Sequence, residues 1–351
     1  MNVIEGYIQR KPIFLEWLHG QLSIDALGTP IGFSDRFHSI HMDTVKVWIL
    51  TMHALCGDMY LQGVDNLNLA SFSNVSFPSH FKECFTLSRL WLPNRFSGDV
   101  PNASMCWIYS SNLDLVDDKR FQECEWTLVL DGPPSIFLQS KDVTQIRGVD
   151  ATHISSEVWR EWCVVLKTAP IRHCAFPQDI VHWDAVPNWS STLKVFKMPA
   201  SSALFDDSTW STFCKDIEVL CLRNESRTWH KWSDQRGEGL RELPKDLYHL
   251  QQLRWLDVSM NCIHQIPEQL QDLQTLQVLN LAHTDLDEFP RVLFALSALR
   301  QLFIRNTNAS STREWLNILS SQNRDLSINR VVNHQRLSLW ELCLISESVP
   351  A

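Results

Sequence analysis

Apolar residues recur at a fixed step of 23 positions in the last third of this chain. Leu250, Leu273 and Leu296 form one column of leucines, and Pro267 and Pro290 keep the same step. The further columns are Leu253, Leu276 and Leu299; Leu256, Leu279 and Leu302; Val258, Leu281 and Ile304; and Leu270, Leu293 and Leu316. A single amphipathic helix spaces its leucines by about three to four residues and excludes internal prolines, so it does not produce these columns. This part of the chain is therefore built from repeats.

Repeats of about 20–29 residues with an L-x-x-L-x-L core are typical of a leucine-rich-repeat solenoid. Each repeat contributes a short strand and a return segment, and it cannot bury its apolar edge without a neighbouring repeat. We therefore predict an α/β fold in which parallel strands at 217–222, 253–258, 276–281 and 299–304 form one edge of a curved solenoid. A helical bundle is the alternative, and the recurring prolines disfavour it.

The repeat pattern weakens toward the N-terminus. Leu67-x-Leu69, Leu90-x-Leu92 and Leu113-x-Leu115 keep the 23-residue step, whereas the spacing is unequal between 116 and 216. The strands that we expect there are Leu128-x-Leu130, Thr144-x-Ile146, Ala169-x-Ile171 and Leu193-x-Val195. We predict degenerate repeats over 63–216, regular repeats over 217–328, and a C-terminal cap or a truncated end over 329–351.

One regular repeat carries an insertion. The step from Leu220 to Leu256 is 36 residues rather than 23, so segment 223–239 adds 13 residues to the period. The segment is rich in Asn, Ser, Arg and Gly, which is typical of a solvated loop. The alternative is a binding loop on the rim of the solenoid.

The composition favours protein partners over nucleic acids. The net charge is -9 and the isoelectric point is about 5.8, whereas phosphate binding requires a basic face. Tryptophans are frequent in the degenerate region, but no basic patch accompanies them for base stacking. We therefore expect these rings to pack in the core. They are Trp126, Trp159, Trp162, Trp183, Trp189 and Trp210.

No motif points to catalysis or to a bound cofactor. The ten cysteines stand without a C-x-x-C pair, and the histidines lack metal-ligand spacing. The sequence contains no nucleophile-elbow motif. The N-terminus lacks the apolar core of a signal peptide, and no stretch approaches about 18 apolar residues. We expect a non-enzymatic, cytoplasmic chain without a cofactor, a metal or a membrane span.

The residues between the strand leucines are the candidates for partner binding. Side chains alternate across a strand, so these residues point away from the leucine core. One tryptophan and three arginines are among them, and both residue types are typical of binding hot spots. A solvated, unoccupied sheet is the alternative. The candidates are Arg223, Trp255, Asp257, Ser259, Gln277, Asn280, Arg300, Phe303 and Arg305.

Two features resemble plant intracellular nucleotide-binding leucine-rich-repeat immune receptors. The regular repeats carry Thr284 and Thr307 where other repeat families carry asparagine. Upstream, Glu5-Gly6-Tyr7-Ile8 and the run from Met52 to Leu61, which reads MHALCGDMYL, resemble the two ends of the last part of the receptor winged helix. The resemblance implies that 1–62 is a winged-helix remnant, and we expect helices at Phe14–Leu18 and Met52–Leu61 with a strand at Val45–Val47.

This resemblance implies a function in defence. The repeats would recognise a pathogen protein, a guarded host protein, or the receptor's own nucleotide-binding module. His53 would contact bound ADP, although Ala54 stands where the family motif has aspartate. The chain has no G-x-x-x-x-G-K-[ST] loop, so ADP or ATP would bind only where a separate nucleotide-binding module is present. The alternative is a generic intracellular repeat scaffold or a microbial effector that binds host proteins. The sequence leaves the oligomeric state open.

Overall fold

A computed structural model describes part of the chain, in segments. The described residues are 2–8, 11–17, 66–68, 75–77, 86–98, 100, 102–112, 123–134, 143–180, 189, 191–200, 215–224, 239–304, 312–323, 325–329, 339, 342–343 and 346. They belong to two compact units. Unit 1 comprises Met1–Gly132 and Gln145–Arg147, and unit 2 comprises Pro133–Thr144 and Gly148–Ala351.

Unit 1 begins with an antiparallel pair of strands, β1 (Asn2–Ile8) and β2 (Lys11–Trp17), in which Asn2 faces Trp17 and Ile8 faces Lys11. The helix that the sequence predicts at Phe14–Leu18 is therefore wrong as far as Trp17. Ile13, Leu15 and Trp17 alternate with the period of a strand, which favours the hairpin. The predicted strand at Val45–Val47 and helix at Met52–Leu61, including His53, lie outside the described residues. The winged-helix assignment stays a prediction.

The other described strands of unit 1 form a parallel sheet and a small parallel pair. The sheet order is β3 (Asn66–Asn68), β5 (Thr86–Trp91), β7 (Asn102–Tyr109) and β8 (Glu125–Val129). The pair is β4 (Val75–Phe77) with β6 (Phe96–Gly98). Leu67 faces Leu90 as the 23-residue step predicts, but Leu90 then faces Cys106. The strand that pairs with β5 therefore lies earlier in the chain than Leu113. The 23-residue leucine spacing does not hold at this step, so it does not predict the residue that pairs with Leu90.

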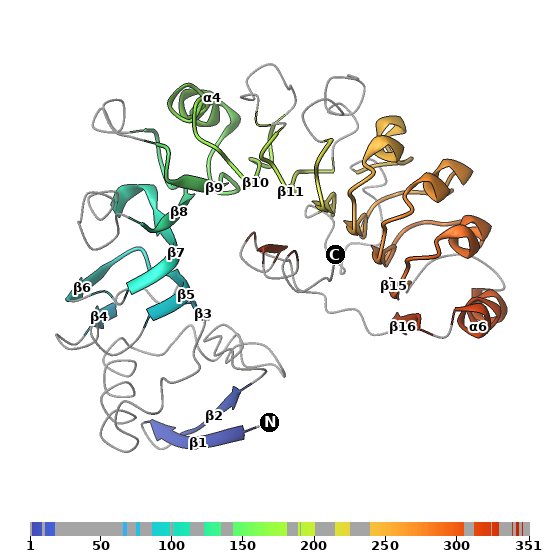
Figure 1. Ribbon diagram of the computed structural model, residues 1–351, viewed down its shortest axis with the longest axis horizontal. Helices are drawn as coiled ribbons and strands as arrows, with labels where there is room; N and C mark the ends of the chain where they lie inside the picture. The colour runs from blue at the N-terminus through green and yellow to red at the C-terminus, as the bar shows by residue number, and fades with distance from the viewer. Residues whose placement is uncertain are drawn as a thin grey trace, which may run out of the picture. The chain divides into compact units, whose positions relative to one another are not determined.

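Unit 2 contains a sheet of short parallel strands, which lie side by side along the chain (Figure 1). The regular repeats supply four of them, as predicted: β12 (Val219–Cys221), β13 (Trp255–Asp257), β14 (Val278–Asn280) and β15 (Gln301–Phe303). The strands before and after these are β9 (Ile146–Asp150), β10 (His173–Ala175), β11 (Val195–Lys197) and β16 (Ser327–Asn329). Leu256, Leu279 and Leu302 are in register and fully buried, so the leucine columns form the core.

Helical segments connect the strands. Three 3-10 helices, η7 (Lys245–His249), η8 (Glu268–Asp272) and η9 (Arg291–Ala295), each follow a proline of the repeat. Proline fixes its own backbone at the start of a helix and donates no hydrogen bond there. Among the described residues the α-helices are α4 (Ser156–Val165) and α6 (Thr312–Gln322). Strands followed by helical return segments are the leucine-rich-repeat fold that the sequence predicts.

The degenerate region departs from the predicted strand positions. Strands β9, β10 and β11 start at Ile146, His173 and Val195. Ala169 and Ile171, which we expected in a strand, instead lie in a turn in which the Ile171 amide donates to the Ala169 carbonyl at 2.9 Å. Both are buried, because the first apolar position of a repeat enters the core before its strand begins. An apolar pair alone does not distinguish these two positions.

The tryptophans of this region are core residues where they are described. Trp126, Trp159, Trp162 and Trp189 are all buried, which confirms that prediction. The ring centroid of Trp159 lies 5.4 Å from that of Phe176 and 6.1 Å from that of Trp189. These contacts replace leucine packing with aromatic packing. Trp183 and Trp210 lie outside the described residues.

Candidate protein-binding face

The strands of unit 2 present a second face, on the side opposite the leucine core. We call it the inner face and define it by two columns of side chains in register. The first column is Val195, Val219, Trp255, Val278 and Gln301, and the second is Lys197, Cys221, Asp257, Asn280 and Phe303. Alternation along each strand places both columns opposite the buried leucines.

Most of the inner face is buried. In the first column, Val195, Val219, Trp255 and Val278 are between 1% and 6% exposed. The side chains of the second column from Lys197 to Asn280 are buried as well. We expected these side chains to be open to solvent, but the structure buries them. An open sheet whose inner face met only water would leave such side chains accessible.

The face opens at its last strands. Gln301 and Arg300 are exposed and Phe303 is half-buried. Ser327 on β16, which is in register with Gln301, is exposed as well. The exposure of the side chains in both columns thus increases between β14 and β15.

The nine predicted residues therefore divide by accessibility. Arg300 is exposed, and Gln277 and Phe303 are half-buried. Arg305 lies outside the described residues. The role of all nine in partner binding stays a prediction. The buried members are Arg223, Trp255, Asp257, Ser259 and Asn280.

Asp257 is the centre of a buried polar cluster. The amide of Ser259 donates to its carboxylate at 2.8 Å. Burial raises the pKa of Asp257, while hydrogen bonds from Ser259 and Asn280 and the positive charge of Arg223 act in the opposite direction. The carboxyl group is thus held by contacts within the chain. Asn280 holds the same turn one repeat later, where the amide of Ala282 donates to its Oδ1 at 3.1 Å.

An ionic rung crosses the start of three strands. Glu218 accepts from Arg254, and the Lys194 Nζ lies 3.4 Å from its Oε1. We did not predict this set of ionic contacts from the sequence. Arg254, Gln277 and Arg300 follow one another at the 23-residue step, each directly before a strand. This column of long polar side chains was the feature of the sequence that could have indicated contacts at the strand starts.

The ends of the insertion meet in a tight contact. Arg223 and Asn224 are buried, unlike a solvated loop. Gly239 has a φ of +126°, and a Cβ there would lie 2.6 Å from the Asn224 side chain. Glycine is therefore required where the insertion rejoins the repeat. Residues 225–238 lie outside the described part, so the binding-loop alternative stays open.

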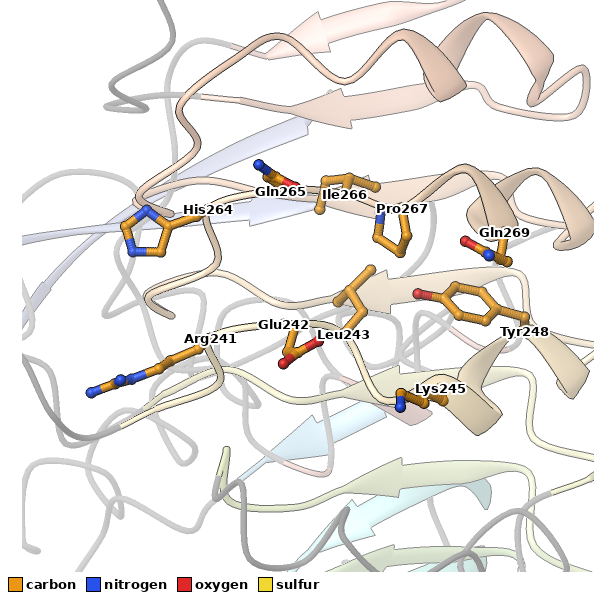
Figure 2. A pocket seen from close by; sticks show the side chains of 10 residues that line it. All are labelled: Arg241, Glu242, Leu243, Lys245, Tyr248, His264, Gln265, Ile266, Pro267 and Gln269. Carbon is orange, nitrogen blue, oxygen red and sulfur yellow. The ribbon is translucent and has the colours of Figure 1, made fainter.

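A pocket of about 590 Å³ lies between two consecutive return segments (Figure 2). Arg241 and His264 stand at one end, and Lys245, Tyr248 and Gln269 at the other. The lining is Arg241, Glu242, Leu243, Lys245, Tyr248, His264, Gln265, Ile266, Pro267 and Gln269.

Tyr248 gives this pocket its one buried polar group. Its hydroxyl has no hydrogen-bond partner among the described residues. Burial raises the pKa of Tyr248 to about 12, and the negative charge of Glu242 contributes. The lining carries both positive side chains, Arg241 and Lys245, and the negative Glu242. It therefore has no single sign of charge that would select an ionic ligand.

The described residues contain no cluster of histidine, cysteine or carboxylate side chains that could hold a metal ion. The cysteines in that part of the chain are all free thiols. Among the helices that the structure describes, none combines the length and apolar character of a membrane span.

No family model matches the sequence, and no curated protein matches it. Solved structures similar to this chain include an internalin from Listeria monocytogenes, with 16% identity, a TM-score of 0.43, and coverage of 78% of this chain and 75% of the internalin. A leucine-rich-repeat protein of Leptospira interrogans has 13% identity and a TM-score of 0.31, over 77% of this chain and 90% of that protein. TLR13, in a complex with ssRNA13, has 16% identity and a TM-score of 0.44, over 77% of this chain and 46% of TLR13. The fold assignment rests on the strands and their register in this chain.

Proposed function

We propose that this chain is a leucine-rich-repeat scaffold that binds a protein on the open end of its inner face. The observation that carries the proposal is the change in accessibility within the inner-face columns, where buried Val278 and Asn280 are followed by exposed Gln301 and half-buried Phe303. Phe303 is a partly exposed aromatic residue, and Arg300, which directly precedes β15, is exposed. Aromatic and arginine side chains are typical of binding hot spots.

The test is affinity capture from a cell lysate, followed by titration of the captured protein in purified form. The variant is Arg300→Ala with Phe303→Ala. Each side chain at an interface centre contributes about 2 kcal/mol or more, so the double variant should weaken binding by about 1,000-fold when the two losses add.

A matched control is available on α4. Arg160 is exposed and Val164 is 77% exposed, so Arg160→Ala with Val164→Ala removes one guanidinium and one apolar side chain away from the inner face. The control should bind as the unaltered chain does. Equal binding by all three proteins would refute the proposed site.

We further propose, more narrowly, that the scaffold belongs to a plant immune receptor of the nucleotide-binding leucine-rich-repeat class. The support is the resemblance of Glu5-Gly6-Tyr7-Ile8 and of the Met52–Leu61 run to the winged-helix motifs of that class. The partner would then be a pathogen protein, a guarded host protein or the receptor's own nucleotide-binding module. The generic scaffold and the microbial effector remain the broader alternatives.

The narrower proposal has a separate test. A receptor nucleotide-binding module, supplied as its own chain, should be captured by the unaltered protein and lost with the Arg300→Ala, Phe303→Ala variant. Failure of the module to bind, together with capture of another protein at the same residues, would leave the scaffold proposal standing and refute the receptor.

A further inference from the structure

The return segments of unit 2 keep the 23-residue step of the repeats. The buried leucine of each segment defines this register through η7, η8, η9 and α6. These leucines are Leu247, Leu270, Leu293 and Leu316. Residues that lie 46 apart, two repeat steps, therefore occupy equivalent positions. The groove between η7 and η8 is in this sense the counterpart of the groove between η9 and α6.

Aromatic side chains fill the groove between η9 and α6. The ring of Trp315, from α6, stacks on that of Phe289, with centroids 6.2 Å apart and an angle of 12° between the planes. It meets the ring of Phe294 edge-on, with centroids 6.1 Å apart. The guanidinium carbon of Arg291 lies 5.1 Å from the centroid of the Trp315 ring. Stacking, edge-on packing and a nearby cation are all favourable for an indole ring.

The pocket between η7 and η8 has the counterparts of these walls but lacks the ring. Two repeat steps before Trp315 stands Gln269, which is exposed. The counterparts of the three residues around Trp315 are an apolar residue, a cation and an aromatic residue, and all three line the pocket. They are Leu243, Lys245 and Tyr248. A volume of about 590 Å³ is open here, within the range of small-molecule sites.

Tyr248 adds a hydrogen-bonding group to this pocket. The residue is 9% exposed, and Figure 2 shows its hydroxyl pointing toward Leu243 and the middle of the pocket. The hydroxyl has no hydrogen-bond partner among the described residues. Burial and the negative charge of Glu242 raise the pKa of Tyr248, so the hydroxyl stays neutral. The negative charge disfavours an anion and burial disfavours any ion, so a neutral N–H is the complementary group.

We propose that the pocket between η7 and η8 binds an indole ring, in the place that Trp315 occupies in the later groove. The ring packs against Leu243 and Tyr248 beside the Lys245 ammonium, and its N–H donates to the Tyr248 hydroxyl. The ring is supplied by a free indole compound or by a tryptophan side chain of another protein. The site is built from return segments, so it does not rest on protein binding at the open end of the inner face.

Two isomeric probes test the ring and the hydrogen bond separately. The N–H is present in 3-methylindole and absent from 1-methylindole, which has the same size. Saturation-transfer NMR with the full chain should give a dissociation constant on the order of 1 mM for 3-methylindole. The constant for 1-methylindole should be about five-fold higher or more, because the hydrogen bond is lost. Tyr248→Phe should abolish this preference, whereas Tyr109→Phe, on β7 and outside the pocket lining, should keep it.

Gln269→Trp introduces the ring of the later groove into this pocket. It should weaken binding of 3-methylindole by about ten-fold or more, because the new side chain fills the same space. Gln322→Trp is the control, since Gln322 is exposed on α6 and does not line the pocket, and it should leave binding unchanged.

A third probe, N-acetyltryptophanamide, distinguishes the two sources of the ring. Binding as tight as that of 3-methylindole identifies a tryptophan side chain, and weaker binding identifies a free indole compound. Failure of 3-methylindole to bind at about 10 mM, ten times the expected dissociation constant, would overturn the proposal. Equal affinities of the unaltered chain for the two isomers, or unchanged binding by Gln269→Trp, would overturn it as well.

Discussion

Leu279→Ala tests the repeat core at its centre. Leu279 is fully buried, and its register partners Leu256 and Leu302 on the two neighbouring strands are fully buried as well. Truncation of a buried leucine costs about 2–5 kcal/mol, depending on how far the site collapses around the cavity. The neighbouring strands are fixed by backbone hydrogen bonds on both sides, so collapse is limited and the cost should lie in the upper part of that range, about 3–5 kcal/mol.

The assay is urea unfolding followed by circular dichroism, with the free energy of unfolding compared between variant and unaltered chain. Val164→Ala is the control, because Val164 is 77% exposed on α4 and its truncation should change stability by less than about 0.5 kcal/mol. In a repeat protein the loss is also local, since each repeat contacts its neighbours only. An unchanged midpoint for Leu279→Ala would refute the assignment of the leucine columns to the core.

Three further predictions concern single groups. Asp257→Asn should remove a pH dependence of the free energy of unfolding. Because the pKa of Asp257 is raised in the folded chain, the folded chain keeps this proton to higher pH than the unfolded chain. The carboxyl group therefore lowers the stability of the fold as pH rises from its ordinary pKa through the raised one. Unfolding free energies at acid and neutral pH should therefore shift in favour of Asp257→Asn as pH rises, and the opposite trend would contradict the burial argument. Tyr248→Phe removes a buried hydroxyl without a described partner and should raise stability by up to about 1 kcal/mol, checked by the thermal midpoint; a clear loss would indicate a partner for the hydroxyl. Purified chain should release no ADP or ATP on denaturation, because the sequence has no phosphate-binding loop, and stoichiometric nucleotide in the supernatant would be the contrary result.

The regular repeats were predictable because their period is redundant. Several columns of leucine and proline specify the same register, so the strands β12 to β15 fall within the predicted segments. The degenerate region offers a single apolar pair per repeat. Ala169 and Ile171 are as buried as strand residues, although they lie in the turn before β10. An apolar pair predicts that two residues are buried. It does not predict where a strand begins, because that depends on backbone pairing with the neighbouring strand.

The sequence also predicted which face of the strands points away from the core. It did not predict whether that face is accessible to solvent. Alternation places Trp255 and Asp257 opposite the leucines. Whether that face meets water depends on parts of the chain far away in the sequence. No local pattern records such a contact. A valine and tryptophan stripe on a face expected to be open was the available signal, because an apolar column is unfavourable in water.

The hairpin of β1 and β2 carries a similar lesson. Phe14, Leu15 and Trp17 suggested a helix because apolar residues stood close together. The alternation of Ile13, Leu15 and Trp17 was the better indicator, since seven paired residues on each strand satisfy the backbone across the hairpin. Short apolar runs fit both periods, and only pairing with Asn2–Ile8 decides between them.

The central claim is that the chain binds a protein through the open end of the inner face. The most direct measurement replaces Phe303 with a benzophenone-bearing residue and irradiates the chain with its captured partner. A covalent adduct at position 303, and none when the same residue replaces Ile318 on α6, is the result that the account predicts. Adduct formation at position 318 with none at position 303 would contradict it.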